Sequence, residues 1–319
     1  MLDKASDLLF LSSQMSLSLY VKYVGLSLVS GFTMFKLFNT FVERKRRDAL
    51  KGKVVVITGA SSGIGEALAH VFYENGSKVV LASRRLSELE RVKQDLLAKN
   101  VNGPTVEPVV VELDLSNLNE LDAFVERVHN LCGQVDILVN NGGVSHRGSI
   151  LHTKMDVYEK IMRINYFGSV GLSKAVLPKM VERKSGQIVF VSSVQGLISI
   201  PDRSAYGASK HAMQAFGDAL RAEMYQHNIS VSVVSPGFVQ TAVSLNALTG
   251  SGDNHGVMDK STAQGFTAEY TATKIIDMIV NKDNELIVSQ CIPRLAIFLR
   301  HTIPSLYFWL MARRANPTV

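Results

Sequence analysis

Apolar and polar residues follow one another in a regular pattern from residue 53 onward. Short runs rich in Val and Ile alternate with helix-length amphipathic segments. The runs are apolar at consecutive positions, which is typical of parallel strands covered by helices on both faces. The pattern predicts an α/β fold with a doubly wound, seven-stranded parallel sheet and helices on both faces. The predicted strands are 53–58, 78–83, 108–113, 135–140, 187–193, 230–235 and 285–289.

A separate apolar segment, 16–41, precedes this body and is interrupted by Lys22 and Lys36. The stretch between these lysines is shorter than the roughly 20 residues that a bilayer core requires, but snorkelling of both side chains makes up the difference. The chain then continues into the basic run 44–47 rather than a cleavage site. We predict an uncleaved membrane anchor with the folded domain facing the cytosol. The alternative is an amphipathic helix packed on the domain or lying in the interface.

Two segments lie outside the strand and helix pattern. The polar stretch 241–268 carries Gly250, Gly252, Gly256 and Gly265 and is too long for a plain connection, so we expect a lid. Residues 292–314 are apolar and contain Pro293 and Pro304. The apolar composition of this segment predicts either a helix that covers the sheet or a surface that contacts a membrane or a partner. The chain therefore divides into an anchor with a basic linker (1–50), an α/β domain (51–290) and an apolar extension (291–319).

Charge and cysteine content narrow the function classes. The net charge is +6, and the basic clusters at 44–47 and 313–314 lie beside apolar segments without stacking aromatics between the charges. Anionic lipid headgroups explain such clusters better than nucleic acid does, and a solvated charged face is the alternative. The two cysteines, Cys132 and Cys291, are too few for a structural metal site or a disulfide framework, and we expect no metal.

Three glycines follow the first predicted strand in Thr58-Gly59-Ala60-Ser61-Ser62-Gly63-Ile64-Gly65. Glycine lets a backbone turn sharply and approach a pyrophosphate, and the N-terminus of the next helix favours negative charge. A tight structural turn is the alternative for this octet alone. About 20 residues later, where an acidic side chain would bind the ribose of NAD, the chain has Ser83-Arg84-Arg85. Guanidinium groups suit a 2′-phosphate, so we predict NADP(H) as the cofactor.

Residues 51–289 resemble the short-chain dehydrogenase/reductase family, whose domain has the Rossmann fold. The octet 58–65 is similar to the family's Thr-Gly-x-x-x-Gly-x-Gly sequence, and Asn140-Asn141-Gly142-Gly143 to its Asn-Asn-Ala-Gly. Asp114-Leu115 resembles the pair that contacts the adenine. Pro236-Gly237 and 239–241 resemble the turn that holds the carboxamide. The resemblance implies cofactor binding by Thr58, Gly59, Ser61, Ser62, Gly63, Ile64, Gly65, Arg84, Arg85, Asp114, Leu115, Asn141, Gly142, Tyr206, Lys210, Pro236, Gly237, Val239 and Thr241.

The same resemblance points to Ser193, Tyr206 and Lys210 as the catalytic set, with Asn165 holding a water that links the lysine to solvent. Tyrosine and lysine at i and i+4 project from one face of a helix. A neighbouring ammonium favours phenolate, so we expect Lys210 to lower the pKa of Tyr206 from its ordinary value of about 10. Tyr206 would then exchange a proton with a substrate oxygen that Ser193 hydrogen-bonds. The implied reaction is hydride transfer between the cofactor and a carbonyl or alcohol.

The substrate is less constrained by the sequence. Segments 204–212 and 256–259 and the C-terminal segment resemble one membrane-bound member of the family, which implies reduction of acyl- or alkyl-dihydroxyacetone phosphate at the endoplasmic reticulum or peroxisome. His146, Arg147 and Lys260 flank the expected pocket and are candidates to meet a phosphate. The alternatives are a retinoid or steroid dehydrogenase/reductase and a membrane-bound NADPH-binding scaffold. Expected partners are a lipid-like carbonyl or alcohol and a membrane, without nucleic acid, and the chain is a candidate for a homodimer or homotetramer.

Overall fold

The computed structural model describes residues 22, 26, 27, 30–42, 44–46, 48–99 and 106–316. The chain divides into two units, Met1–Ala49 and Leu50–Val319. In the first unit, residues 30–42 form a helix with exposed apolar side chains such as Phe32 and Phe35. Part of the predicted anchor segment 16–41 lies outside the described residues. Among the helices that are described, none has both the length and the apolar character needed to cross a bilayer.

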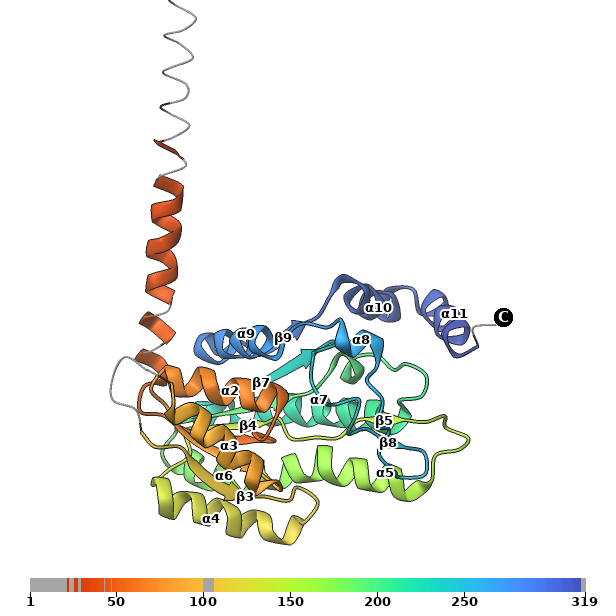
Figure 1. Ribbon diagram of the computed structural model, residues 1–319, viewed down its shortest axis with the longest axis horizontal. Coiled ribbons are helices and arrows are strands. Elements are labelled where there is room, and N and C mark those ends of the chain that lie inside the picture. Colours follow the sequence, from red (N-terminus) through yellow and green to blue (C-terminus); the bar gives the residue numbers. More distant parts are fainter. Residues whose placement is uncertain are drawn as a thin grey trace, which may run out of the picture. The chain divides into compact units, whose positions relative to one another are not determined.

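The second unit is built on a seven-stranded sheet in which every neighbouring pair of strands is parallel, as the sequence predicts. The strand order is β3-β2-β1-β4-β6-β7-β9, so the order reverses at β1 and β4 (Figure 1). Ligands of such sheets bind outside the carboxyl ends of the strands at this reversal. The strands are β1 (Val54–Thr58), β2 (Lys78–Ser83), β3 (Val109–Glu112), β4 (Ile137–Asn140), β6 (Gly186–Val191), β7 (Ile229–Pro236) and β9 (Glu285–Val288).

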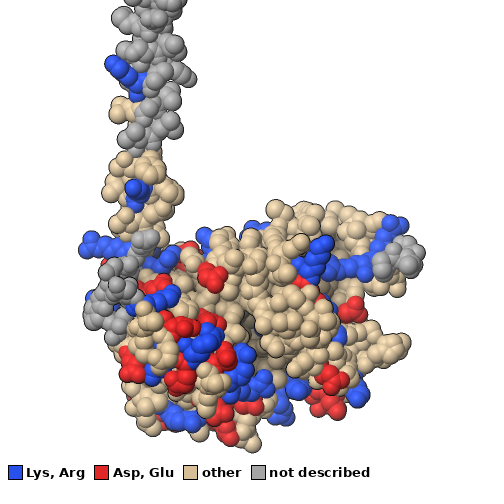
Figure 2. Space-filling model, viewed as in Figure 1, with Lys and Arg blue, Asp and Glu red and all other residues tan. Residues whose placement is uncertain are grey.

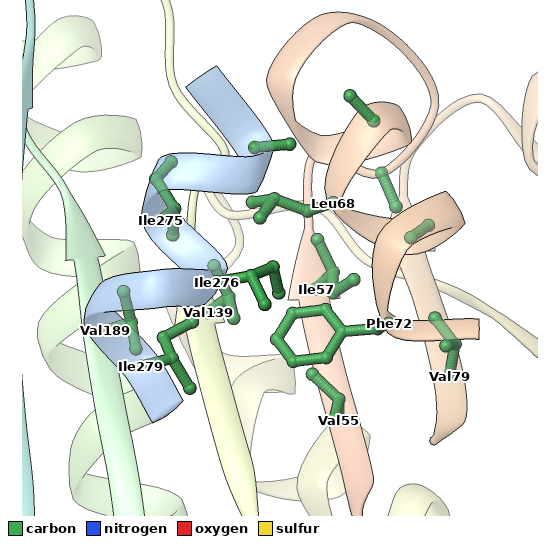
Figure 3. Close-up of a cluster of buried hydrophobic side chains, with 14 of the residues drawn as sticks. Val55, Ile57, Leu68, Phe72, Val79, Val139, Val189, Ile275, Ile276 and Ile279 are labelled. Carbon is green, nitrogen blue, oxygen red and sulfur yellow. The ribbon is translucent and has the colours of Figure 1, made fainter. Parts of the chain in front are cut away.

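Helices cover both faces of the sheet and enclose two cores. One face carries α2 (Gly63–Glu74), α3 (Leu86–Leu97) and α9 (Ala268–Asn281), and the other α4 (Leu121–Cys132), α6 (Gly168–Glu182) and α7 (Ser204–Met224). Figure 3 shows Leu68 and Phe72 of α2 and Ile276 of α9 gathered around Ile57 of β1. Burying each such side chain contributes about 1.5–3 kcal/mol, so these contacts hold the Gly-rich end of α2 against β1.

Close packing also places α7, the helix predicted to carry Tyr206 and Lys210. A Cβ on Gly217 would lie 2.6 Å from Cγ2 of Val233, so the absence of a side chain lets α7 approach β7. Van der Waals contact between carbon atoms requires about 3.5–4.0 Å, which only glycine permits here. The close approach sets α7 alongside the carboxyl ends of β6 and β7, where the ligand crevice is expected.

The remaining elements lie beside this crevice. A small parallel sheet joins β5 (His146–Arg147) to β8 (Leu248–Thr249), and α5 (Met155–Met162) follows β5. The polar stretch 241–268 is thus not a simple loop, because it contains β8 and α8 (Lys260–Ala263) and buries Ser244 and Ala247. After β9 the chain forms α10 (Cys291–Thr302) and α11 (Pro304–Ala315) within the same unit.

Candidate active site

A cavity of about 490 Å³ opens at the carboxyl ends of the strands. Its wall contains residues that follow β1, β2, β3, β4, β6 and β7. Most of the residues predicted for cofactor and catalysis line it: Gly59, Ser61, Ser62, Gly63, Ile64, Arg84, Arg85, Asp114, Leu115, Asn141, Gly142, Ser193, Tyr206, Lys210, Pro236, Gly237, Val239 and Thr241. The convergence of these distant segments on one crevice is what the parallel topology requires of strand ends.

The glycines after β1 are placed where a side chain would not fit. Gly59 has a φ of +67°, which favours glycine, and a Cβ on Gly65 would lie 2.3 Å from the carbonyl oxygen of Gly59. The first turn of α2 therefore lies directly against the turn that precedes it. Thr241, from the segment after β7, covers the turn, because its Cγ2 would be 2.9 Å from a Cβ on Gly63. Gly63 and Ile64, the first residues of α2, line the cavity, which places a helix N-terminus where it can bind a dinucleotide pyrophosphate.

Thr58 and Asn141 join the ends of β1 and β4. The Thr58 hydroxyl accepts hydrogen bonds from the backbone N–H groups of Asn141 at 3.0 Å and Gly142 at 2.8 Å. The Asn141 amide donates to the Thr58 carbonyl at 2.9 Å. Both residues thus fix the reversal point of the sheet, and of the two only Asn141 reaches the cavity wall. The role of Thr58 is to position the turn.

Arg85 spans the end of β2 and the glycine-rich turn. One nitrogen of its guanidinium donates to the hydroxyls of Ser61 and Ser62, both at 2.9 Å. The three side chains form a cationic, hydroxyl-bearing group at the rim of the cavity. A 2′-phosphate is recognised by such donors, because its oxygens accept charge-assisted hydrogen bonds. At the next strand end, the Asp114 carboxylate is held by the backbone N–H and hydroxyl of Ser116 at 2.9 Å and 2.8 Å.

Ser193, Tyr206 and Lys210 meet at the far end of the same cavity. Ser193 begins a 3₁₀ turn (Val194–Gly196) just beyond β6, where its hydroxyl accepts from the N–H of Gln195 at 3.1 Å. The Ser193 hydroxyl also hydrogen-bonds the Tyr206 phenol. Lys210 is buried, and its Nζ donates to the Val191 carbonyl at 2.8 Å and lies 5.8 Å from the centre of the Tyr206 ring.

Electrostatics at this group differ from the sequence-based expectation. Burial raises the pKa of Tyr206, and the hydrogen bond from Ser193 and the charges of Arg147 and Arg203 oppose that rise without reversing it. Burial also lowers the pKa of Lys210 to about 8. The pKa of Tyr206 is therefore shifted in the opposite direction to the prediction, because removal from water disfavours charge on the phenol as it does on Lys210. A protonated phenol is the form that donates to a substrate oxygen.

Asn165 lies one layer behind these groups, in a π-helical turn (Arg163–Phe167) between α5 and α6. Its side chain is fully buried, and it both accepts from the N–H of Val144 at 2.8 Å and donates to the Val144 carbonyl at 2.9 Å. It also donates to the Ser209 hydroxyl at 2.9 Å. Asn165 thus ties the segment after β4 to α7, which fixes the position of Lys210 one residue further along. It does not reach the cavity wall.

The residues predicted to meet a phosphate lie behind the cavity wall. Arg147 is engaged with Asp259, whose carboxylate accepts from its Nε at 2.8 Å and from Arg203 at 3.4 Å. His146 is buried, and Lys260 is exposed at the start of α8. None of Arg147, His146 and Lys260 is part of the cavity wall. Arg147 does contact Ser145, a wall residue, through a 2.7 Å hydrogen bond, and its charge acts on Tyr206.

Comparison with known proteins decides the family. Residues 53–250, more than half of the chain, match the short chain dehydrogenase family. The chain belongs to the short-chain dehydrogenase/reductase family. It is therefore an oxidoreductase. A "Dehydrogenase/reductase SDR family protein 7-like" from Drosophila melanogaster is 55% identical over 88% of this chain and 86% of that protein. "Dehydrogenase/reductase SDR family member 7B" from Mus musculus is 45% identical over 89% of this chain and 87% of that protein.

Solved structures of the family agree with the fold. A short-chain dehydrogenase/reductase from Burkholderia phymatum in complex with NAD is 26% identical, with a TM-score of 0.70 over 85% of this chain and 98% of that one. A metagenomic short-chain oxidoreductase in complex with NADP is 28% identical, with a TM-score of 0.61 over 75% of this chain and 97% of that one. A nicotinamide dinucleotide is accordingly the class of cofactor that the cavity fits.

One departure from the family's sequence has a structural explanation. Gly142 stands where the family has alanine, and a Cβ there would lie 2.6 Å from Cδ1 of Leu115 and 3.3 Å from the Thr58 hydroxyl. Leu115 thus fills the space that an alanine methyl would take. The wall therefore stays closed at this point without the methyl group.

Some wall residues were not predicted from the sequence. Ser145, Asn246, Leu248 and Asn254 line the cavity from the β5–β8 sheet and the chain around it. They do not end a strand of the main sheet, so the strand pattern gave no signal for them. The ion pairs of Asp259 with Arg147 and Arg203, behind the wall, were not predicted either, because these partners are distant in sequence. Asn246, Leu248, Asn254 and Asp259 belong to the insert between β7 and α9, which forms this side of the site together with the segment around β5.

Proposed function

We propose that this enzyme uses NADPH to reduce a carbonyl group on a lipid-like substrate at a membrane surface. The observation that carries this proposal is the convergence of Ser193, Tyr206 and Lys210 on the cavity that also holds Arg85 and the glycine-rich turn. One end of the cavity has a hydroxyl, a phenol and an amine, which suit proton transfer to a carbonyl oxygen. The other end has a glycine-rich turn, which suits the phosphates of a dinucleotide.

A bound nicotinamide supplies the hydride to the carbonyl carbon. The Ser193 hydroxyl and the Tyr206 phenol hydrogen-bond the carbonyl oxygen and orient it. As negative charge develops on that oxygen, Tyr206 donates its proton. Lys210 is buried beside the phenol, and its ammonium form stabilises the charge that remains on Tyr206. Asn165 holds α7 in place and so keeps both side chains aligned.

NADP(H) is favoured over NAD(H) by Arg85. Its guanidinium already lies against the hydroxyls of Ser61 and Ser62, and Arg84 adds a second positive charge. An acidic side chain, which would repel a 2′-phosphate and bind the ribose hydroxyls of NAD, is absent at 83–85. Family members in complex with NADP and with NAD both resemble this fold, so the distinction rests on these side chains.

The substrate class follows from chemistry around the site. Arg147 and Arg203 place two guanidiniums behind the wall, with Asp259 between them, and the positive charge of both acts on the Tyr206 phenol. Positive charge at this position favours an anionic carbonyl compound, and an acyl- or alkyl-dihydroxyacetone phosphate has both the ketone and the phosphate. The apolar segment 16–41 and the basic run 44–47 support attachment to a membrane with the α/β unit facing the cytosol. The resemblance to a membrane-bound member of the family favours the endoplasmic reticulum or the peroxisome as the location.

The reaction is tested with the full chain in phospholipid vesicles, by following NADPH oxidation with an acyl-dihydroxyacetone phosphate, its dephosphorylated form, a ketosteroid and a retinal. We expect the phosphorylated ketone to react fastest. Tyr206→Phe should lose about 10²–10⁴-fold in rate, because it removes the proton donor. Tyr225→Phe is the matched control, since Tyr225 is 86% exposed just beyond α7. If the natural chain turns over every substrate no faster than Tyr206→Phe does, the result would favour a binding or scaffold function instead.

The charged side of the site is tested separately with Arg147→Ala. Loss of rate with the phosphorylated ketone and not with its dephosphorylated form supports a phosphate near Arg147, whereas equal loss with both contradicts it. The orientation is tested by protease treatment of sealed vesicles from cells that express the chain. A domain that is cut from the cytosolic side supports the proposal, and a shielded domain overturns it.

A further inference from the structure

The last two helices present their apolar side chains to the outside. Figure 1 shows α10 and α11 following β9 at the end of the described chain. A helix on a globular domain usually turns its apolar stripe toward the core. Here the exposed large apolar residues are Ile292 (80%), Leu295 (55%), Phe298 (57%), Ile303 (48%), Leu306 (39%), Phe308 (54%), Trp309 (50%) and Leu310 (38%).

Hydrogen bonds from two side chains, Arg294 and Tyr307, join these helices to the domain. Arg294 donates to the carbonyls of Ile287 at 2.7 Å and Ser289 at 3.2 Å, which fixes the start of α10 to the end of β9. Tyr307 is 2% exposed, and its hydroxyl donates to the carbonyl of Ser199. Tyr307 is thus the side chain through which α11 is anchored to the domain. Both helices are fixed to the domain by these contacts. Their exposed apolar face therefore has a defined position.

The charge of this surface is of one sign. The segment 291–316 contains Arg294, Arg300, Arg313 and Arg314 and no Asp or Glu, whereas the whole chain has 28 acidic residues. Two of these arginines lie over exposed rings: Arg300 is 4.9 Å from the centre of the Phe308 ring and Arg313 is 4.2 Å from that of Trp309. Figure 2 shows this part of the surface as tan interrupted by blue. Apolar and aromatic side chains bordered by arginine are the composition of helices that lie in a membrane interface.

We propose that α10 and α11 form a contact surface for an anionic lipid bilayer, with the apolar side chains in the interface and the arginines at the headgroups. Each arginine gains free energy from the negative surface potential of such a membrane. The charge distinguishes this occupant from a second copy of the chain. In a two-fold contact the same patch meets itself, so these arginines would face one another without an acidic partner on the patch.

The surface borders the substrate side of the site. Ser199, which binds Tyr307, lies in the connection between Ser193 and Tyr206. Arg314 is close enough to Arg203, just before α7, for its charge to lower the pKa of that guanidinium. A lipid-like substrate would therefore leave the bilayer beside the catalytic groups. This last consequence rests on the proposed function, whereas the lipid contact itself does not.

Trp309 makes the contact measurable in the full chain, because it is the single tryptophan in the sequence. The chain is reconstituted in vesicles of phosphatidylcholine alone or mixed with phosphatidylserine, and bromine-labelled lipid is used as a quencher. We expect Trp309 emission to move to shorter wavelength and to be quenched in the phosphatidylserine vesicles, and much less so in phosphatidylcholine. Segment 16–41 has no tryptophan, so its insertion contributes no emission of its own, and the comparison of the two lipids isolates the contact of Trp309.

The variant Arg300→Gln/Arg314→Gln removes two charges while leaving the contact of Arg313 with Trp309 intact. We expect the ratio of docked to undocked Trp309 to fall about fivefold for each charge removed. Arg127→Gln/Lys154→Gln removes two exposed charges from other elements and should leave the ratio unchanged. The proposal is overturned if Trp309 emission is equal in the two lipids. It is also overturned if the emission shifts with the protein-to-lipid ratio, because contact between two copies of the chain would cause such a shift. Because no step measures turnover, failure of the proposed reaction leaves this result unaffected.

Discussion

Arg147 and Asp259 are 112 residues apart in sequence, yet they form an ion pair with a 2.8 Å hydrogen bond from Nε to the carboxylate. The side chains are 10% and 18% exposed, so water screens the pair only weakly. Arg147 belongs to β5 and Asp259 directly precedes α8. The pair therefore fastens the insert between β7 and α9 to the segment that follows β4, on the substrate side of the cavity.

The first prediction concerns the loss of this pair. Asp259→Asn leaves Arg147 and Arg203 close together without a compensating charge, and breaking a buried pair in this way costs about 3–5 kcal/mol. We expect a lower apparent melting temperature in thermal unfolding. Asp253→Asn is the matched control, because Asp253 is exposed on the same insert and its carboxylate accepts a hydrogen bond from the hydroxyl of Ser251 at 2.6 Å. Equal melting temperatures for the two variants would contradict a structural role for the pair.

The same pair predicts a dependence on acid. Burial alone would raise the pKa of Asp259, but the hydrogen bond and charge of Arg147 and the charge of Arg203 outweigh it and lower the pKa. A carboxyl whose folded-state pKa lies below its unfolded value adds stability above the unfolded pKa, and that stability is lost as the pH falls through the folded value. The gap in melting temperature between the natural chain and Asp259→Asn should therefore be largest near neutrality and close below about pH 4.

The sequence was sufficient to predict the sheet and most of one end of the site. All seven strands of the main sheet lie within two residues of their predicted bounds, because consecutive apolar residues are the direct signature of strands buried on both faces. Strand ends in such a sheet converge, so a residue such as Arg85 could be assigned to the crevice from its position alone. This end of the cavity was predictable because its residues follow the strands.

The substrate side was not predictable in the same way. Arg203 and Asp259 meet only because β8 pairs with β5, and a two-residue strand leaves no periodic pattern in the sequence. Burial also reversed one electrostatic expectation. The i, i+4 spacing of Tyr206 and Lys210 predicted their common face, but the direction of the pKa of Tyr206 depends on how much water reaches the phenol. That quantity is a property of the packed structure.

A second prediction follows from the pKa of Lys210, which burial lowers to about 8. The ammonium form predominates below this value and is lost above it, so kcat/KM for carbonyl reduction should fall as the pH rises past about 8. Lys210→Met should be slow and should lack this alkaline limb. A profile that stays flat from pH 7 to about pH 9.5 in the natural chain would show that the charge of Lys210 does not assist the reaction.

Stability gives an independent check on the same group. The folded-state pKa of Lys210 lies below the ordinary value of 10.5, so between about 8 and 10.5 the unfolded chain binds more protons. Stability therefore rises with pH across this window, by roughly 3 kcal/mol in all. Measured against Lys210→Met, which lacks the group, the natural chain should gain in melting temperature from pH 7 to pH 10. A difference that does not change with pH would place the pKa of Lys210 near its ordinary value.

A third prediction compares two glycines. A Cβ on Gly65 would meet the backbone carbonyl of Gly59 at 2.3 Å, whereas a Cβ on Gly142 would meet the tip of the Leu115 side chain at 2.6 Å. Backbone cannot move without opening the turn, but a leucine can change rotamer. Gly65→Ala should abolish measurable NADPH binding in fluorescence titration, and Gly142→Ala should change the affinity less than about tenfold, the range of overpacking costs near 1 kcal/mol. If both variants lose NADPH affinity to a similar extent, the Leu115 side chain does not move aside for the added methyl group.

The last prediction concerns the choice of cofactor. The Arg85 guanidinium lies within 2.9 Å of two hydroxyls on the turn that would hold the pyrophosphate, so a 2′-phosphate placed there receives charge-assisted hydrogen bonds. Hydrogen bonds to charged groups contribute about 1.5–3 kcal/mol, which corresponds to about 10–150-fold in affinity. Arg85→Ala should raise KM for NADPH by this factor while leaving KM for NADH within about twofold. Arg91→Ala is the matched control, because Arg91 is an exposed arginine of the next helix that pairs with Glu66 and does not line the cavity. Equal increases for NADPH and NADH in Arg85→Ala would assign Arg85 to the structure of the turn instead of to the 2′-phosphate.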